Sequence, residues 1–131
     1  MSPRWDLILV GGGLANGLIA WRLHHARPDL RLLMVEAGAQ PGGNHTWSFH
    51  QADLTEAQHR WIAPLVSHRW PGYEVRFPAR QRTLEGGYLS ISSEHFAQKI
   101  TQTLGAALLT DTPVASLTPQ SVTLESGETL H

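Results

Sequence analysis

Cysteine is absent from the 131 residues of this sequence. Its absence excludes disulfide bonds, thiolate catalysis and cysteine-ligated zinc or iron–sulfur sites within this stretch, and it agrees with a reducing cytoplasm. The sequence also lacks a basic run, and its net charge of -1 argues against a nucleic-acid partner bound through phosphates. No apolar run approaches the roughly 20 residues of a membrane-spanning helix, and the N-terminus lacks the pattern of a secretion signal. Peripheral contact with a membrane stays open.

What the sequence does contain is enough apolar residues for one ordinary soluble domain. Hydrophobic residues make up 41% of the chain, which suffices for a core of useful size. A short apolar strand is predicted over residues 6–10, followed by three glycines and by a helix over residues 14–25. Pro28 ends that helix, and a second apolar strand is predicted over residues 30–35. This order predicts a βαβ unit with parallel strands and a right-handed crossover.

The glycines between the first strand and the helix predict a dinucleotide-binding turn. Glycines let the backbone turn tightly and approach a pyrophosphate, which lies at the positive N-terminus of the following helix. When Gly11 and Gly13 are aligned with the fingerprint Gly-x-Gly-x-x-Gly, the third glycine is replaced by Asn16, and Gly17 comes one position late. That position serves close packing of the helix on the strand. Asn16 therefore either holds the helix slightly away or donates a polar contact to the ligand.

The carboxylate of Glu36, directly after the second strand, indicates which dinucleotide fits. A carboxylate accepts hydrogen bonds from a free ribose 2′-hydroxyl but repels a 2′-phosphate, so FAD or NAD is favoured over NADP. The glycine pair Gly42-Gly43 follows after a short loop, and this pattern is similar to that of the flavoproteins built like aromatic hydroxylases and glutathione reductase. FAD is therefore the predicted cofactor. Its predicted binding residues are Gly11, Gly13, Leu14, Ala15, Asn16, Glu36, Gly42 and Gly43.

The rest of the chain is predicted to contain short strands and two helices. A loop is expected over residues 37–46, and Arg80 and Arg82 are expected to flank a turn. Helices are predicted over residues 54–66 and 94–104, and strands over residues 73–77, 88–91, 107–109, 114–117 and 121–124. The predicted fold class is α/β, a Rossmann-like FAD/NAD(P)-binding three-layer fold. Residues 1–45 would form its βαβ unit, and residues 46–131 the start of the inserted, substrate-side region and further strands.

The segments 13–20, 42–50 and 59–65 are more specific than the glycine turn alone. In these segments the chain resembles the bacterial lycopene β-cyclases, and the resemblance extends from Asp6 to Gly127. Members of that family are expected to carry asparagine in place of the third glycine, so Asn16 supports the resemblance. Complete members are much longer, and a further strand is expected to begin at Thr129. The resemblance therefore implies that the 131 residues are an N-terminal fragment and that the fold is incomplete.

The resemblance implies an enzyme of carotenoid biosynthesis. Lycopene β-cyclases bind FAD and need it reduced, with NAD(P)H as the external reductant, yet no electrons move between substrate and product. The linear end of lycopene is protonated, the neighbouring double bond attacks the carbocation, and loss of a proton leaves a β-ring; two such isomerisations give β-carotene. The essential acidic residues of the family lie mostly beyond residue 131, so no catalytic acid is assigned and the fragment alone is expected to be inactive. The expected location is the cytoplasm, and peripheral attachment to the inner face of the cell membrane stays open.

Several conspicuous residues have both a structural and a functional interpretation. The eight histidines show no ligand pattern with carboxylates, so no metal site is predicted. His45 is expected to hydrogen-bond within the loop near the cofactor, and an acid–base role for His45 or His50 stays open. Trp47 and Phe49 either pack in the core or face flavin or polyene.

Two further groups could contact a membrane. An apolar cluster on a short helix, for which core packing is the default interpretation, is formed by Trp61, Ile62, Leu65 and Val66. A basic strip, which is either a solvated face or a site for anionic lipid head groups, is formed by Arg76, Arg80 and Arg82. Two other functions stay open for the chain as a whole: an FAD-dependent monooxygenase or dehydrogenase of the same fold, and an inactive truncated product.

Overall fold

A computed structural model describes residues 3–131 of the chain. The chain separates into two compact units. The first unit combines residues Met1–Gly43 with Ala97–His131, and the second consists of Asn44–Phe96. Residues 97–131 therefore group with the N-terminal segment rather than with residues 44–96. The predicted division of the chain into residues 1–45 and 46–131 concerns the domains of the whole protein and stays a prediction.

The first unit contains the βαβ motif that the sequence predicts. Strand β1 (Leu7–Val10) and strand β2 (Leu32–Val35) pair in parallel, with Leu7 opposite Leu32 and Val10 opposite Val35. Helix α1 (Leu14–Ala26) connects them, and β8 (Leu108–Leu109) pairs in parallel with the other edge of β2. All four residues of β2 are buried, as expected for a central parallel strand that is covered on both faces.

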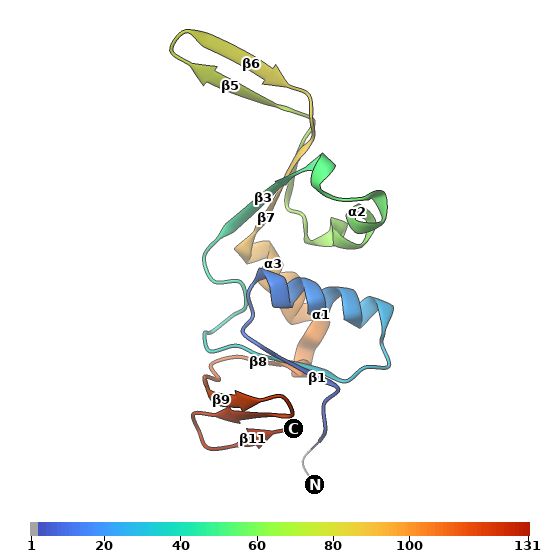
Figure 1. Ribbon diagram of the computed structural model, residues 1–131, viewed down its shortest axis with the longest axis vertical. Helices are drawn as coiled ribbons and strands as arrows, with labels where there is room; N and C mark the ends of the chain where they lie inside the picture. The colour runs from blue at the N-terminus through green and yellow to red at the C-terminus, as the bar shows by residue number, and fades with distance from the viewer. Residues whose placement is uncertain (1–2) are drawn as a thin grey trace. The chain divides into compact units, whose positions relative to one another are not determined.

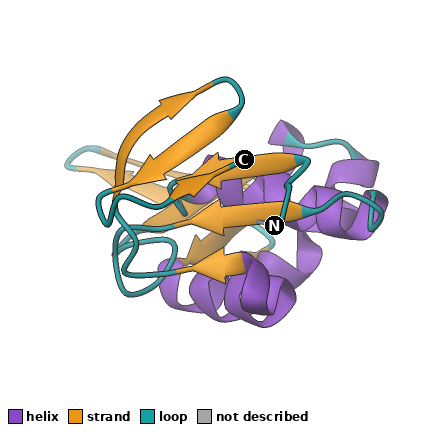
Figure 2. Ribbon diagram, turned by 90° about the horizontal axis from the view of Figure 1, so that it is seen from below, coloured by secondary structure: helices purple, strands orange, loops and turns teal. Residues whose placement is uncertain are grey.

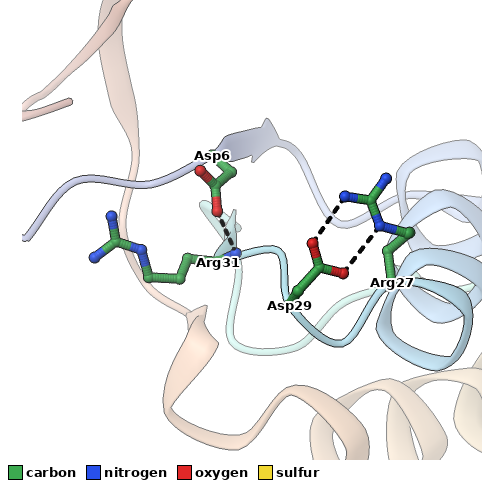
Figure 3. A network of polar contacts seen from close by, with 4 residues as sticks. All are labelled: Asp6, Arg27, Asp29 and Arg31. Carbon is green, nitrogen blue, oxygen red and sulfur yellow. Dashed lines mark hydrogen bonds and ion pairs between the residues drawn. The ribbon is translucent and has the colours of Figure 1, made fainter.

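The connection from α1 to β2 is a polar turn, and the second strand begins after it, later in the sequence than predicted. The guanidinium of Arg27 donates two hydrogen bonds to the Asp29 carboxylate, at 2.9 and 2.8 Å, and the Leu30 N–H donates to the carbonyl of Arg27 at 3.1 Å. Asp6 accepts a hydrogen bond of 2.7 Å from the Arg31 N–H (Figure 3). Because these bonds fix the turn, β2 begins at residue 32 and not at the predicted residue 30.

A second sheet gives the first unit its third layer, beside the parallel sheet and helix α1. It consists of β9 (Val114–Thr118), β10 (Ser121–Leu124) and β11 (Thr129–Leu130), antiparallel in the order β11-β10-β9. Its apolar side chains pack on one face of the parallel sheet in a cluster that is built around Leu33, Val35, Val122 and Leu124. Helix α1 packs on β1 and β2 from the opposite face, where Ala20 and Trp21 are buried. Figure 2 distinguishes the strands, in orange, from the helices, in purple.

The second unit is built on an antiparallel sheet. Its strand order is β3-β7-β4, and the strands are β3 (Thr46–His50), β4 (His68–Trp70) and β7 (Tyr88–Ser92). Helix α2 (Glu56–Ile62) is capped by Thr55, whose hydroxyl accepts from the Gln58 N–H, and a 3-10 turn over Ala63–Leu65 follows. Strands β5 (Tyr73–Phe77) and β6 (Arg80–Leu84) form a separate hairpin, and α3 (Ser93–Leu104) begins at the end of this unit (Figure 1).

The structure corrects two predictions in the second unit and adds two strands. Residues 80–84 form strand β6, so Arg80 and Arg82 lie within a strand and do not flank a turn. The turn is formed by Pro78 and Ala79, since Phe77 pairs with Arg80. The predicted helix over residues 54–66 is shorter, because Pro64 lacks the N–H that would continue it. Strands β3 and β4 were not predicted. No helix within residues 3–131 has the length and hydropathy needed to cross a membrane.

Candidate functional site: the glycine turn and Glu36

The turn between β1 and α1 places Gly11 next to the end of β2 and Gly13 at the start of α1. Gly11 has φ +96°, a conformation that favours glycine, and its N–H donates to the Val35 carbonyl at 2.8 Å. Gly13 is the N-cap of α1, and a Cβ built on it would meet no atom within 4 Å. The turn is therefore tied to the sheet at Gly11 and leaves open space at Gly13.

The N-terminus of α1 is suited to an anion. The first N–H groups of an α-helix have no acceptor within the helix and carry partial positive charge. In α1 these groups belong to Leu14, Ala15 and Asn16, and the first intrahelical bond runs from the Gly17 N–H to the Gly13 carbonyl at 2.8 Å. The first turn has no acidic side chain, and no side chain caps the helix. Backbone donors could therefore bind a pyrophosphate here.

The Glu36 carboxylate is oriented by two backbone donors. Its Oε1 accepts from the Gly12 N–H at 2.9 Å, and its Oε2 accepts from the Gly38 N–H at 2.6 Å. Each carboxylate oxygen has two lone pairs, so one acceptor position on each oxygen is left for a ribose hydroxyl. The side chain is partly buried at the carboxyl end of β2, where parallel α/β sheets bind ligands.

The loop after Glu36 packs directly on Gly12. A Cβ on Gly12 would lie 2.9 Å from the Pro41 Cβ and 3.2 Å from Glu36 Oε1, distances that real Cβ atoms rarely or never adopt. The Gly42 N–H donates to the Gly12 carbonyl at 2.8 Å, and Gly42 and Gly43 have φ of +92° and +63°. The contacts of Gly38, Pro41 and Gly12 were not predicted from the sequence. The only signal that could have pointed to them was Gly12 itself, the additional glycine between Gly11 and Gly13.

Asn16 contacts the glycine turn itself. Its Nδ2 donates to the carbonyl of Val10 at 2.9 Å and to the carbonyl of Gly11 at 2.8 Å. These two bonds use both amide hydrogens, which leaves only the side-chain oxygen for a ligand. Gly17, one position later, is buried. The sequence left two alternatives for Asn16, a helix held slightly away from the strand or a polar contact donated to the ligand. In this position the side chain has no amide hydrogen left to donate to a ligand.

The other residues with functional interpretations lie in the second unit. The Trp47 ring packs edge-on against Phe96 at a centroid distance of 5.2 Å, and Phe49 stacks on His59 at 6.4 Å. Both aromatic residues therefore take part in packing. The His45 N–H donates to Ser93 Oγ at 3.1 Å, so the backbone of His45 joins the start of β3 to the start of α3.

The structure also bears on two other groups of residues, the histidines and the apolar cluster of Trp61, Ile62, Leu65 and Val66. Within residues 3–131 no group of three histidine or acidic side chains is arranged to hold a metal ion. In the apolar cluster Ile62 and Leu65 are buried, in agreement with core packing, while Trp61 and Val66 are half-buried.

A cavity lies beside strand β1 and is lined by Asn16 as well, on the side of the glycine turn away from Glu36 and its loop. It has a volume of about 730 Å³ and is lined mainly by residues 4–10 and 117–122. Strand β1 is the edge of the parallel sheet, and this groove follows its unpaired side. None of the described residues 36–43 lines it. The cavity is therefore a groove beside an open sheet edge and does not include the Glu36 carboxylate.

Comparison with protein families decides the assignment. The model of the family described as "Lycopene cyclase protein" matches residues 6–131. The chain belongs to the lycopene cyclase family. It is 61% identical over 125 residues to a lycopene β-cyclase of Pseudescherichia vulneris, covering 95% of this chain and 32% of that protein. It is 56% identical over 130 residues to the lycopene β-cyclase of Pantoea ananas, covering 99% of this chain and 34% of that protein. The chain thus spans about a third of the length of these curated relatives.

Solved structures show the fold. The tetrameric 2-methyl-3-hydroxypyridine-5-carboxylic acid oxygenase superposes with a TM-score of 0.72 at 17% identity, over 99% of this chain and 37% of that chain. The amino acid oxidase NikD superposes with a TM-score of 0.61 at 17% identity, over 98% of this chain and 49% of that chain. The predicted Rossmann-like fold of FAD-dependent enzymes is therefore confirmed for this member of the lycopene cyclase family.

Proposed function

We propose that the protein to which this chain contributes is an FAD-dependent lycopene β-cyclase. The observation that carries this proposal is the Glu36 carboxylate, held at 2.9 Å from the Gly12 N–H beside an open helix N-terminus, in a chain of the lycopene cyclase family. The curated relatives bear the name lycopene β-cyclase. The substrate is accordingly lycopene, and the product is β-carotene when both ends are cyclised.

The ADP half of FAD would be held by residues of the first unit. Backbone N–H groups of Leu14, Ala15 and Asn16 would bind the pyrophosphate, which would approach the backbone most closely at Gly13. Glu36 would accept hydrogen bonds from the ribose hydroxyls, and its charge would exclude a 2′-phosphate. The Asn16 side chain, unlike its backbone N–H, would act on the cofactor through the glycine turn. The remaining proposed contributors are Gly11, Gly42 and Gly43, whose positive φ values shape the two loops.

The reaction that follows from this assignment is an isomerisation. A proton adds to the terminal double bond of lycopene, the neighbouring double bond attacks the cation and closes the ring, and a proton leaves the adjacent carbon. Reduced flavin, regenerated by NAD(P)H, would supply negative charge that stabilises the cationic transition state. The proposed role of the chain described here is cofactor binding; no catalytic acid is assigned within it, so we expect the 131 residues alone to be inactive. Because lycopene dissolves in lipid, we place the enzyme in the cytoplasm on the inner membrane face.

An assay of the full-length protein tests this function. Lycopene is incubated with reduced FAD without oxygen, and the products are separated by chromatography. β-Carotene is expected with reduced FAD, and much less is expected with oxidised FAD. Formation of an oxygenated or dehydrogenated product, or a requirement for oxygen, would contradict the cyclase assignment.

The rival function is a flavin monooxygenase or dehydrogenase. It is favoured by one observation, since the solved structures that share the fold include an oxygenase and an oxidase. Fold alone does not fix chemistry, and their identity to this chain is only 17%. The third possibility, an inactive truncated product, predicts a stop codon directly after His131, whereas the cyclase predicts an in-frame continuation.

A further inference from the structure

The β5–β6 hairpin is the part of the second unit whose surface the cofactor site leaves unexplained. Its two strands pair only with each other, with Val75 opposite Arg82 and Phe77 opposite Arg80. Figure 1 shows the hairpin extending beyond the β3-β7-β4 sheet of the same unit. An isolated two-stranded hairpin is marginally stable in water, so a structure of this kind gains from a surface that it can pack against.

The base of the hairpin is anchored to the sheet. The Tyr73 ring lies 5.6 Å from the rings of both His50 and Tyr88, measured between centroids. Gly72 permits a close approach, because a Cβ there would come within 2.5 Å of the Leu84 carbonyl oxygen. The contacts at the base therefore hold the hairpin in place while its tip is left exposed.

The tip of the hairpin is apolar and exposed. Phe77 is 65% exposed, the highest value among the large apolar side chains that are exposed within residues 3–131. The turn residues Pro78 and Ala79 are exposed as well. Three consecutive apolar residues therefore project into solvent at one end of the second unit. An aromatic ring in this position is typical of elements that enter the interface of a bilayer.

The two faces of the hairpin differ in charge. Residues directly opposite one another share a face, so Val75, Phe77, Arg80 and Arg82 lie on one side. On the other side the guanidinium of Arg76 donates to Glu74 at 3.0 Å. Glu74 also accepts from the Gln81 amide.

Positive charge therefore remains on the apolar face. Arg80 and Arg82 are exposed and have no hydrogen bond or ion pair with any described residue of the chain. The nearest further acid in the sequence, Glu85, comes only after the base of the hairpin. Two unpaired guanidinium groups beside an aromatic tip match the chemistry of an anionic lipid surface, whose phosphates accept bidentate hydrogen bonds from arginine.

We propose that the β5–β6 hairpin is a membrane-contacting element. Phe77, Pro78 and Ala79 enter the interfacial layer of an anionic bilayer, and Arg80 and Arg82 bind lipid phosphates. The purpose of this contact, access to a substrate dissolved in lipid, rests on the proposed function; the contact itself rests on the exposure and charge of the hairpin.

The test uses full-length enzyme loaded with FAD and two kinds of vesicle. One kind contains phosphatidylcholine alone, and the other contains phosphatidylcholine with phosphatidylglycerol. Sedimentation should show preferential binding to the anionic vesicles that weakens as salt is raised. Phe77→Ser should lower the partition coefficient about tenfold, and Arg82→Gln about fivefold.

Two matched variants control for general surface effects. Leu117→Ser removes an apolar side chain of similar exposure, 60%, from β9 of the first unit. Arg76→Gln removes a charge from the opposite face of the same hairpin. Neither should change vesicle binding by more than about twofold. Equal effects of Phe77→Ser and Leu117→Ser, or equal binding of the enzyme to both kinds of vesicle, would overturn the proposal. The proposal would also be overturned if another segment covers Phe77 in the full-length enzyme and the enzyme does not bind vesicles.

A separate readout distinguishes failure of the hairpin proposal from failure of the cyclase assignment. Phe77→Ser should keep its bound FAD and should cyclise lycopene delivered in detergent at the wild-type rate, but it should lose most activity on lycopene in vesicles. If wild-type enzyme binds anionic vesicles yet makes no ring in detergent, the cyclase assignment fails and the membrane contact stands. If Phe77→Ser does not fold, the comparison of Arg82→Gln with Arg76→Gln decides the outcome.

Discussion

Glu36 accepts a hydrogen bond from the backbone N–H of Gly12 at 2.9 Å and so joins the end of β2 to the glycine turn after β1. The same carboxylate accepts from Gly38 at 2.6 Å, so one side chain orients two loops before any ligand binds. A site that is oriented in advance loses less conformational freedom on binding. Glu36 therefore orients both loops, and we propose that it also recognises the ribose.

Glu36→Gln should weaken FAD binding strongly. The glutamine amide places N–H groups opposite one of the two backbone N–H donors, and it also removes the charge-assisted bonds to the ribose. We expect the dissociation constant for FAD to rise about 10- to 100-fold, measured by calorimetry on the apo form of the full-length protein. Glu125→Gln, an exposed position, is the matched control and should bind FAD normally. Unchanged affinity in Glu36→Gln would refute the ribose assignment.

Gly12→Ala and Gly13→Ala should fail in different ways. A methyl group on Gly12 meets Pro41 at 2.9 Å, so the apo protein should lose about 1–3 kcal/mol of its free energy of unfolding. A methyl group on Gly13 meets nothing, and φ of -73° suits alanine, so stability should stay within about 1 kcal/mol of wild type. Gly13→Ala should nevertheless bind FAD poorly, because the methyl group occupies the space where a pyrophosphate approaches. Chemical denaturation and FAD titration of both variants give the comparison; tight FAD binding by Gly13→Ala would contradict the proposed position of the pyrophosphate.

Much of the first unit could be predicted from the sequence because its signals are local. A continuous apolar run specifies β1, and the glycines specify the turn before α1. Strand β6 was missed because its five residues, Arg80–Leu84, are almost all polar and pair only within a hairpin. The environments of Asn16 and Pro41 could not be predicted either, since both depend on contacts between loops that come together only in the folded chain.

Asn16→Asp should disturb the glycine turn. The substitution replaces two donated bonds, to the carbonyls of Val10 and Gly11, with a carboxylate that repels both oxygens and a bound pyrophosphate. Both thermal stability and FAD affinity should fall. Asn16→Gly, which restores the generic fingerprint, should also lose affinity because it removes the same two bonds. Gln98→Glu, an equal change of charge at an exposed position of α3, is the control. If Asn16→Gly bound FAD more tightly than wild type, the positioning role of Asn16 would be wrong.

The Arg27–Asp29 pair predicts a small effect on stability in acid. The hydrogen bond from Arg27 lowers the pKa of the Asp29 carboxyl below its ordinary value. A carboxyl group whose pKa is lower in the folded state stabilises the fold above its unfolded pKa, and this contribution disappears as the pH falls through the folded pKa. Both side chains are more than half exposed, so the effect should be slight. Denaturation midpoints of Asp29→Asn and wild type should differ slightly at pH 7 and converge in acid; a difference that grows in acid would contradict the assigned pKa direction.

The central claim is that a flavin-binding fold serves a reaction without net electron transfer, and isotope incorporation tests it most directly. Full-length enzyme with reduced FAD converts lycopene in D₂O without oxygen, and the product is measured by mass spectrometry. Because protonation places one solvent-derived hydrogen on carbon for each ring closed, the account predicts β-carotene that carries one deuterium per ring. In ordinary water the product should have the same mass as lycopene. A product that is heavier by oxygen, lighter by hydrogen, or free of deuterium after ring closure in D₂O would contradict the account.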